Sequence, residues 1–190
     1  MLRPKFTACL MAGGKSSRMG RDKALVEFEG EPLWLRQMRM LDALGANEML
    51  ISGRKGSAYA EAGVLIVEDQ IADAGPLSGI ESALEAAAHP LVLVLAVDMP
   101  WMTASYLKNL LQTCEPARGV VPKHDLLFEG LAAVYPKAAR TVAMDALMSP
   151  DRSIQHFARE CASRGLIKAL HICEADAPLF RSVNEPSDIR

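Results

Sequence analysis

The chain has 190 residues, half of them hydrophobic and 23% charged, which is the composition of a soluble globular protein with a core of its own. The 21 Lys and Arg residues nearly balance the 23 Asp and Glu residues, and the net charge of −2 excludes a bulk attraction to nucleic acid or anionic membranes. The longest apolar run, residues 91–97, is far shorter than the roughly 20 residues of a membrane-spanning helix.

The first 14 residues and the cysteines indicate where the protein works. Two early basic residues precede an apolar stretch, but that stretch runs into a cationic, glycine-rich segment with no context for signal cleavage. The cysteines at positions 9, 114, 161 and 173 form no CxxC pair and have no histidine at ligand spacing. We therefore expect reduced, mostly buried thiols in a cytoplasmic protein.

The first half of the chain alternates short apolar runs with amphipathic helical patterns. The apolar runs predict strands over residues 6–11, 48–51, 64–67, 91–97 and 120–121. The helical patterns cover residues 32–44, 57–62, 78–88 and 103–113. Because residues 91–97 are apolar without alternation, both faces of that strand should be covered, as in a central parallel strand. This order of elements predicts an α/β fold with a Rossmann-like, mostly parallel sheet flanked by helices.

The second half has a different pattern. It predicts a strand over residues 128–135, helices over 137–148 and 153–164, and a strand over 166–173. These elements would add an antiparallel excursion to the sheet. No linker or repeat interrupts the chain, so we expect one domain over residues 1–190.

A glycine-rich, basic segment follows the first predicted strand. Residues 11–25 read MAGGKSSRMGRDKAL, and glycine combined with positive charge is typical of phosphate sites. The segment is not a Walker A loop, because Cys9 stands where that motif needs glycine. It is not a dinucleotide-binding GxGxxG either, because Gly13 and Gly14 are adjacent.

The residues of this segment nevertheless suit a phosphate ligand. Gly13 and Gly14 let the backbone approach a ligand with its N–H groups, and Arg18 and Lys23 add two cations. The segment follows the carboxyl end of a strand, which is the edge where open α/β sheets bind ligands. The alternative is a solvated turn with incidental charges.

The segment resembles the signature LAGGxSxRMGxDKAL of the molybdenum cofactor guanylyltransferases. Four later segments continue the resemblance at similar spacing: VED at 67–69, GPLSG at 75–79, VDMP at 97–100 and NEPSD at 184–188. The resemblance implies a single nucleotidyltransferase domain of the nucleotide-diphospho-sugar transferase type. It also implies transfer of GMP from Mg-GTP to the terminal phosphate of molybdopterin or the molybdenum cofactor.

Such a transfer needs cations, backbone donors and a divalent metal rather than a general base, because a phosphate nucleophile is already anionic. The resemblance implies Arg18, Lys23 and Asp98 as catalytic residues and Mg²⁺ as the cofactor. The residues that it implies for nucleotide binding are Met11, Ala12, Gly13, Gly14, Arg18, Lys23, Asp69 and Asp98.

Asp98 is the expected Mg²⁺ ligand. It follows a long buried strand, and Mg²⁺ prefers one or two carboxylates together with substrate phosphates. The alternative is that Asp98 caps the helix beginning near Thr103, although Thr103 can serve as that cap itself. Asp69 corresponds to the family's nucleotide-binding Asp, and a carboxylate there can bind guanine N–H groups or the ribose.

The second substrate is less well defined by the sequence. The expected contacts to it, or to a second metal, are Gly75, Pro76, Leu77, Gly79 and Asn184. Asn184 fits a helix cap as well as a site residue, and Ser182 and Glu185 depart from the family's FxNxNTP. Further departures are Ser52-Gly53, where relatives often carry a polar side chain, and HDLLFEG at 124–130, which lacks the proline common in the family's substrate-facing strand.

Two alternatives remain open. Cytidylyltransferases of the same fold resemble LAAGxSxRMG, and the absence of a methyl group at Gly13 leaves room for a purine, which favours GTP. An accessory GTP-binding protein without turnover is the non-enzyme alternative, and Arg18, Lys23 and Asp98 together argue against it. Molybdoenzymes or their chaperones are left open as further partners, and the sequence does not define an oligomeric state.

Overall fold

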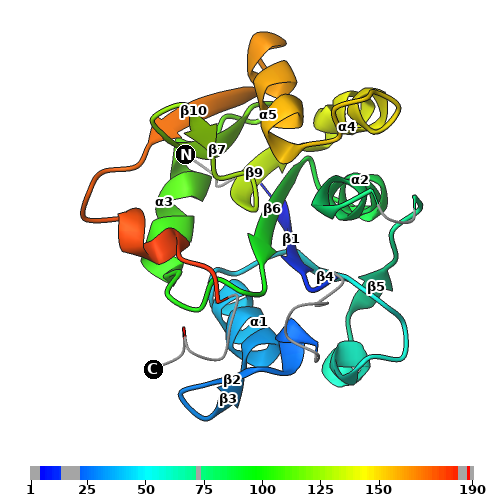
Figure 1. The fold of residues 1–190 in the computed structure, drawn as a ribbon, viewed down its shortest axis with the longest axis vertical. Coiled ribbons are helices and arrows are strands. Elements are labelled where there is room, and N and C mark those ends of the chain that lie inside the picture. The colour runs from blue at the N-terminus through cyan, green and yellow to red at the C-terminus, as the bar shows by residue number, and fades with distance from the viewer. Residues whose placement is uncertain (1–4, 14–21, 72–73, 184–187, 189–190) are drawn as a thin grey trace.

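The computed structural model describes residues 5–13, 22–71, 74–183 and 188. It contains one eight-stranded sheet with helices on both faces (Figure 1). The strands in spatial order are β10 (Ile167–His171), β7 (Gly119–His124), β9 (Ala132–Pro136), β6 (Leu91–Ala96), β1 (Phe6–Met11), β4 (Glu48–Ser52) and β5 (Leu65–Val67), with β8 (Leu127–Phe128) on β7. A separate hairpin consists of β2 (Glu27–Phe28) and β3 (Glu31–Pro32).

The sheet is mostly parallel, as predicted. β1 pairs in parallel with β4 and β6, β4 with β5, and β10 with β7. β9 pairs antiparallel with both β6 and β7. The short β8 also runs antiparallel to β7. The predicted antiparallel excursion in the C-terminal half is thus confirmed.

Five α-helices cover the sheet among the residues described. They are α1 (Leu33–Ala43), α2 (Pro76–Ala86), α3 (Ala104–Thr113), α4 (Arg140–Leu147) and α5 (Ile154–Ser163). Four 3-10 helices connect other elements: η1 (Lys23–Leu25), η2 (Ala58–Ala62), η3 (Lys137–Ala139) and η4 (Ala177–Phe180). None of these helices is long and apolar enough to cross a bilayer.

The core lies in two layers, one on each face of the sheet. On β6, Leu91, Leu93 and Leu95 pack with α1 and α3, and Val92 and Val94 pack with α2, α4 and α5. All five of these side chains are fully buried. Successive residues of a strand point to opposite faces, so only a strand covered on both sides is apolar throughout. The prediction for this strand is confirmed.

Helix starts follow their local chemistry. Gly75 has φ 69° and precedes Pro76, the first residue of α2, where the missing N–H of proline costs nothing. The hydroxyl of Thr103 accepts a hydrogen bond from the amide of Tyr106 and caps α3. Ser153 caps α5 in the same way, through the amide of His156.

The structure differs from the prediction mainly between residues 128 and 139. The single strand expected over 128–135 is wrong, because the chain turns between β8 and β9, where the amide of Ala132 donates to the carbonyl of Glu129 at 3.2 Å. A Cβ atom at Gly130, within this turn, would come 2.3 Å from Ile154 Cγ2. The carbonyl of Gly130 accepts a hydrogen bond from the Tyr135 hydroxyl at 3.0 Å. The expected helix over 137–148 begins as η3 and continues as α4. The segment expected as a helix over 57–62 is the 3-10 helix η2.

Candidate active site

The carboxyl ends of β1, β4 and β6 are tied together by backbone hydrogen bonds. The carbonyl of Ser52, at the end of β4, accepts from the amides of both Ala12 and Gly13, at 2.8 and 2.9 Å. The carbonyl of Met11 accepts from the amide of Val97 at 3.1 Å. These bonds fix the point at which the glycine-rich segment leaves β1.

A side chain at Gly13 would fit against the backbone of Ser52 and Gly53 without a clash. Gly13 is exposed, and a Cβ atom added there would be in ordinary van der Waals contact with Gly53 Cα, at 3.6 Å. The protein itself therefore does not require glycine at this position. The remainder of the segment, which carries Gly14 and Arg18, lies outside the described residues.

Lys23 and Asp98 face each other across the strand ends. Lys23 Nζ lies 2.9 Å from Asp98 Oδ2, and the two side chains are 25% and 20% exposed. Lys23 is the first residue of η1, and the carboxylate of Asp22 caps η1 by accepting from the amide of Ala24. The structure thus places a cation and the expected metal ligand at one point. Because Thr103 caps α3, the alternative role of Asp98 as that helix cap does not apply.

Met11, Ser52 and Asp69 converge on Gly79 in α2. A Cβ atom at Gly79 would lie 2.5 Å from Ser52 Oγ, 2.7 Å from Met11 Cε and 3.3 Å from Asp69 Oδ1. Partial burial raises the pKa of the Asp69 carboxyl above its ordinary value. The absence of a side chain at Gly79 is therefore what allows three side chains from β1, β4 and the loop after β5 to meet.

The residue types at positions 52 and 53 are explained by two different contacts. Ser52 is 1% exposed and belongs to the group around Gly79. A Cβ atom at Gly53 would lie 2.3 Å from the hydroxyl oxygen of Tyr59, which accepts a hydrogen bond from the amide of Arg54 at 2.9 Å. Tyr59 is almost fully buried, and sequence reasoning did not identify it. Its only signal is an aromatic residue in a segment that was expected to be an ordinary helix.

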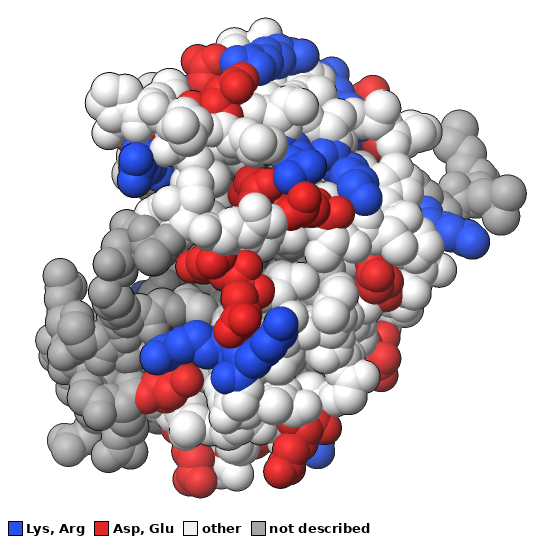
Figure 2. All heavy atoms as spheres, turned by 90° about the vertical axis from the view of Figure 1, so that its right-hand side faces the viewer, with Lys and Arg blue, Asp and Glu red and all other residues white. Residues whose placement is uncertain are grey.

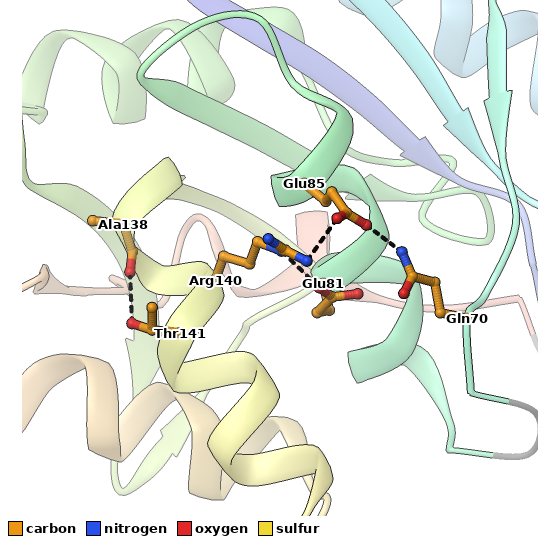
Figure 3. A network of polar contacts seen from close by, with 6 residues as sticks. All are labelled: Gln70, Glu81, Glu85, Ala138, Arg140 and Thr141. Atoms are coloured by element: carbon orange, nitrogen blue, oxygen red, sulfur yellow. Dashed lines mark hydrogen bonds and ion pairs between the residues drawn. The ribbon is translucent and has the colours of Figure 1, made fainter.

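A polar network braces the loop that carries Asp69 (Figure 3). The side-chain Nε2 of Gln70 donates to Glu85, and the carboxylates of Glu85 and Glu81 both bind the guanidinium of Arg140, at 2.7 and 2.8 Å. The backbone amide of Ile71 donates to the hydroxyl of Ser78, which is fully buried in α2. Both residues after Asp69 are thereby attached to α2.

The face of the molecule that carries α2 and α4 has no field of a single sign. Figure 2 shows acidic and basic side chains next to one another over this face, in keeping with the net charge of −2. This face therefore presents no broad positive surface to a polyphosphate. Among the described residues, the expected metal ligand Asp98 forms an ion pair with Lys23 at the strand ends.

The expected contacts to a second substrate are only partly described. Gly75 and Pro76 are exposed, and Leu77 is fully buried in the core, so its side chain has no access to a ligand. Asn184 lies outside the described residues. The preceding residue, Val183, donates its amide to the carbonyl of Asp98 at 2.8 Å, which brings the C-terminal segment to the site.

The donor set around Asp98 suits a metal that is shared with a substrate. Within the part of the chain that the structure describes, no group of three or more His, Cys, Asp or Glu side chains could hold a metal alone. Mg²⁺ commonly takes one or two carboxylates and completes its octahedral shell with substrate phosphates and water. A single strand-end carboxylate beside a lysine fits that habit.

Comparison with known proteins gives one consistent result. The sequence pattern of the family described as "MobA-like NTP transferase domain" matches residues 8–183. The chain is 36% identical to the probable molybdenum cofactor guanylyltransferase of Opitutus terrae, over 96% of this chain and 92% of that one. It is 34% identical to the molybdenum cofactor guanylyltransferase of Pseudomonas aeruginosa, over 96% and 92%.

The fold is also similar to a solved structure. Molybdopterin-guanine dinucleotide biosynthesis protein A from Archaeoglobus fulgidus superposes with a TM-score of 0.74 at 20% identity, covering 96% of this chain and 94% of that one. At this level of identity the likeness concerns the fold. The overall arrangement of sheet and helices is thus one that this solved protein shares.

Proposed function

The chain belongs to the family of MobA-like NTP transferase domains, and from this membership we propose that it is a molybdenum cofactor guanylyltransferase. The reaction moves GMP from GTP to the terminal phosphate of molybdopterin or the molybdenum cofactor. The attacking phosphate oxygen forms a bond to the α-phosphorus of GTP, and the bond from that phosphorus to the bridging oxygen of pyrophosphate breaks. The products are the guanine dinucleotide cofactor and pyrophosphate.

The chemical task is to bring two anions together and to stabilise charge on the departing pyrophosphate. The attacking phosphate is already anionic at pH 7, so a general base is not needed. Positioning and positive charge therefore supply most of the catalysis. Asp98 would hold Mg²⁺, which supplies charge neutralisation on the triphosphate.

In this proposal the glycine-rich segment and the two cations hold the triphosphate. Met11, Ala12, Gly13 and Gly14 offer backbone groups, and Arg18 grips phosphate oxygens in a fork. Lys23 supplies a point charge beside Asp98. The contact of 2.9 Å between Lys23 and Asp98 is the single observation that carries the proposal, because it joins the signature segment to the strand-end carboxylate.

Asp69 would select the nucleoside. An ionised carboxylate can accept two hydrogen bonds from guanine N1–H and the exocyclic amine, or contact the ribose. Asp69 lies beside Ser52 and Gly79, and hydrogen bonds to α2 hold the two residues that follow it, Gln70 and Ile71. These contacts support a fixed position for its carboxylate. Gly75, Pro76 and Asn184 remain the proposed contacts to the second substrate or a second metal, and Leu77 can take part only through its backbone. Gly79 lies instead beside Asp69, at the nucleoside end of the site.

The names of the relatives favour GTP over CTP. The protein does not itself require glycine at position 13, because a Cβ atom there would be in ordinary contact with Gly53 and Ser52, so we infer that the ligand requires it. The cytidylyltransferase alternative differs from the proposal at this position and can be tested there. The non-enzyme alternative, GTP binding without turnover, differs from it in requiring no carboxylate at Asp98.

We place the reaction in the cytoplasm and treat residues 1–190 as one nucleotidyltransferase domain. Molybdoenzymes or their chaperones are the class of partner that would take up the product.

The test is transfer of label from GTP carrying ³²P at its α-phosphate to molybdopterin, with CTP in parallel and Mg²⁺ present. We expect dinucleotide and pyrophosphate from GTP, little product from CTP, and no product with Asp98→Ala. Equal or better use of CTP would move the protein to the cytidylyltransferases. GTP binding without pyrophosphate release, in the presence of acceptor, would instead support the accessory protein.

A further inference from the structure

The loop that carries Asp98 is held in place by hydrogen bonds that its backbone carbonyls accept from other elements. The carbonyl of Met99 accepts a hydrogen bond from Gln37 Nε2 at 2.7 Å, and the carbonyl of Pro100 accepts one from Arg36 Nε at 3.2 Å. Both donors lie on α1. The carbonyl of Asp98 itself accepts a hydrogen bond from the amide of Val183, in the C-terminal segment. The carbonyls of three successive residues, beginning with the proposed metal ligand Asp98, are therefore fixed by hydrogen bonds from other parts of the chain.

Gln37 is an unusual residue for its surroundings. It is fully buried on the face of α1 that packs against the sheet. Its Nε2 has the bond to Met99, but its Oε1 is buried without a hydrogen-bond partner. An unpaired buried oxygen costs free energy of folding, and methionine would fill nearly the same volume without that cost. Gln37 is thus not the residue that stability alone would favour.

Arg36 holds the outer end of the same loop. Its Nη1 forms an ion pair with Glu29 at 3.0 Å, and its guanidinium lies over the ring of Phe28, with Cζ 4.9 Å from the centroid. Phe28 in turn packs edge-on against Trp101, which directly follows Pro100. Because the guanidinium is fixed on two sides, its bond to the Pro100 carbonyl restrains the loop.

We propose that Gln37 is a positioning residue, which fixes the Asp98 carboxylate for the metal by holding the next carbonyl in the chain, with Arg36 as a second support. The inference rests on the proposed metal role of Asp98. Residues behind a metal ligand that fix its orientation typically change metal affinity or activity by about 10- to 100-fold when they are lost. Without Gln37 the Met99 carbonyl keeps the bond from the Met102 amide, at 3.1 Å, but loses its attachment to α1, so the backbone next to Asp98 is less well fixed.

The first test is Gln37→Met. This variant keeps the volume, removes the donor to Met99 and also removes the unpartnered oxygen. The readouts are Mn²⁺ affinity in the presence of GTP, measured from the electron paramagnetic resonance signal of free Mn²⁺, and Tm of the protein without nucleotide. We expect Mn²⁺ affinity to fall by about 10- to 100-fold while Tm stays the same or rises. Gln112→Met, the same change at an exposed position of α3, should leave both unchanged.

If Gln37 only fills the core, its replacement should change Tm and leave Mn²⁺ affinity unchanged. A lower Tm with unchanged Mn²⁺ affinity in Gln37→Met would overturn the proposal. A second pair of variants covers the case in which the core variant fails to fold. Arg36→Ala should weaken Mn²⁺ binding, and Arg39→Ala should not, because Arg39 on the same helix pairs with Glu31 and not with the loop. Equal effects of Arg36→Ala and Arg39→Ala would count against a supporting role.

Asp98→Asn separates this inference from the proposed function. If Asp98→Asn weakens Mn²⁺ binding and Gln37→Met does not, the positioning role is wrong and the metal role stands. If Asp98→Asn leaves Mn²⁺ binding intact, the metal role is wrong and the positioning role fails with it.

Discussion

The ammonium nitrogen of Lys23 lies 2.9 Å from Oδ2 of Asp98, although 75 positions separate the two residues in the chain. Both side chains are partly exposed, and an ion pair of that kind contributes little to stability. Its consequence is positional, because it places the last cation of the glycine-rich segment at the strand-end carboxylate.

Replacing Lys23 by Gln should therefore impair the reaction much more than the fold. We expect kcat/KM for GTP to fall by roughly 10²- to 10³-fold, the range seen when one donor to developing charge is removed. Steady-state kinetics and a thermal melt check this, with Lys23→Arg as the variant that keeps the charge. A large fall in Tm with nearly normal kinetics would show that the pair is structural.

Asp69 should make GTP binding sensitive to mild acid. Its pKa is raised by partial burial, so protonation begins at a higher pH than for an ordinary Asp, and the protonated group loses its capacity to accept two N–H bonds. GTP affinity should thus fall as the pH falls through this raised pKa. Calorimetric titrations at a series of pH values measure the effect, and Asp69→Asn corrects for titration of the nucleotide itself.

The raised pKa of Asp69 has the opposite effect on the folding stability of the protein without nucleotide. A folded-state pKa above the unfolded value means that the folded state binds more protons in that window. This one group therefore adds stability as the pH falls and removes it as the pH rises. A pH dependence of GTP affinity that survives unchanged in Asp69→Asn would exclude Asp69 as its source.

Two glycines should respond very differently to alanine. In Gly79→Ala the new Cβ atom meets the ends of the Ser52 and Met11 side chains, which can move, and alanine favours the helix. We expect nearly unchanged Tm and a loss of about 10- to 100-fold in kcat/KM for GTP, because the side chains packed around Asp69 are displaced.

In Gly53→Ala, by contrast, the Cβ atom meets the buried and hydrogen-bonded ring of Tyr59. Overpacking of this kind destabilises by about 1–3 kcal/mol. Denaturant melts of the two variants provide the comparison. Equal stability of Gly53→Ala and the unchanged protein would mean that Tyr59 can move away.

Arg140→Ala should lower Tm by several degrees. It leaves Glu81, whose side chain is only 5% exposed, without its ion-pair partner, and it also frees Glu85, which holds Gln70 (Figure 3). The matched control is Arg164→Ala, because Arg164 pairs with the well-exposed Asp145 on α4. Similar Tm values for both variants would show that the Arg140 network stabilises the protein no more than an exposed ion pair does.

Thiol labelling should distinguish the four cysteines. Burial raises the pKa of Cys9, Cys114 and Cys161 to about 12, so these thiols are almost entirely protonated at neutral pH. Cys173 is exposed. A disulfide reagent should therefore modify one thiol rapidly in the folded protein and all four after denaturation. Rapid reaction of two or more thiols in the native state would contradict this assignment.

Much of the fold could be predicted from the sequence because it depends on local patterns. The unbroken apolar run at 91–97 identified a strand covered on both faces, and the signature segment after β1 identified the edge that carries the candidate site. Thr103 was also identified as the cap of α3. These features depend on hydrogen-bonding capacity and hydrophobic period, which are visible in a single sequence.

The rest could not be predicted because it depends on contacts between distant residues. Nothing near Gln37 in the chain indicates that its amide reaches the carbonyl after β6. The contact that leaves no room for a Cβ atom at Gly130 comes from Ile154 on α5, and the brief β2–β3 hairpin carries too few residues for a pattern. The convergence of Met11, Ser52 and Asp69 on Gly79 needs three elements to be in place.

The bond from the Val183 amide to the Asp98 carbonyl has a consequence for synthesis on the ribosome. Met11, Ser52, Asp69 and Gly79 have all been translated when the chain is less than half made, whereas Val183 follows more than 80 positions after Asp98. Domains generally fold as units, so the site is complete only after Val183 has been added to the chain. A chain that stops short of Val183 would lack the bond that connects the C-terminal segment to the Asp98 loop.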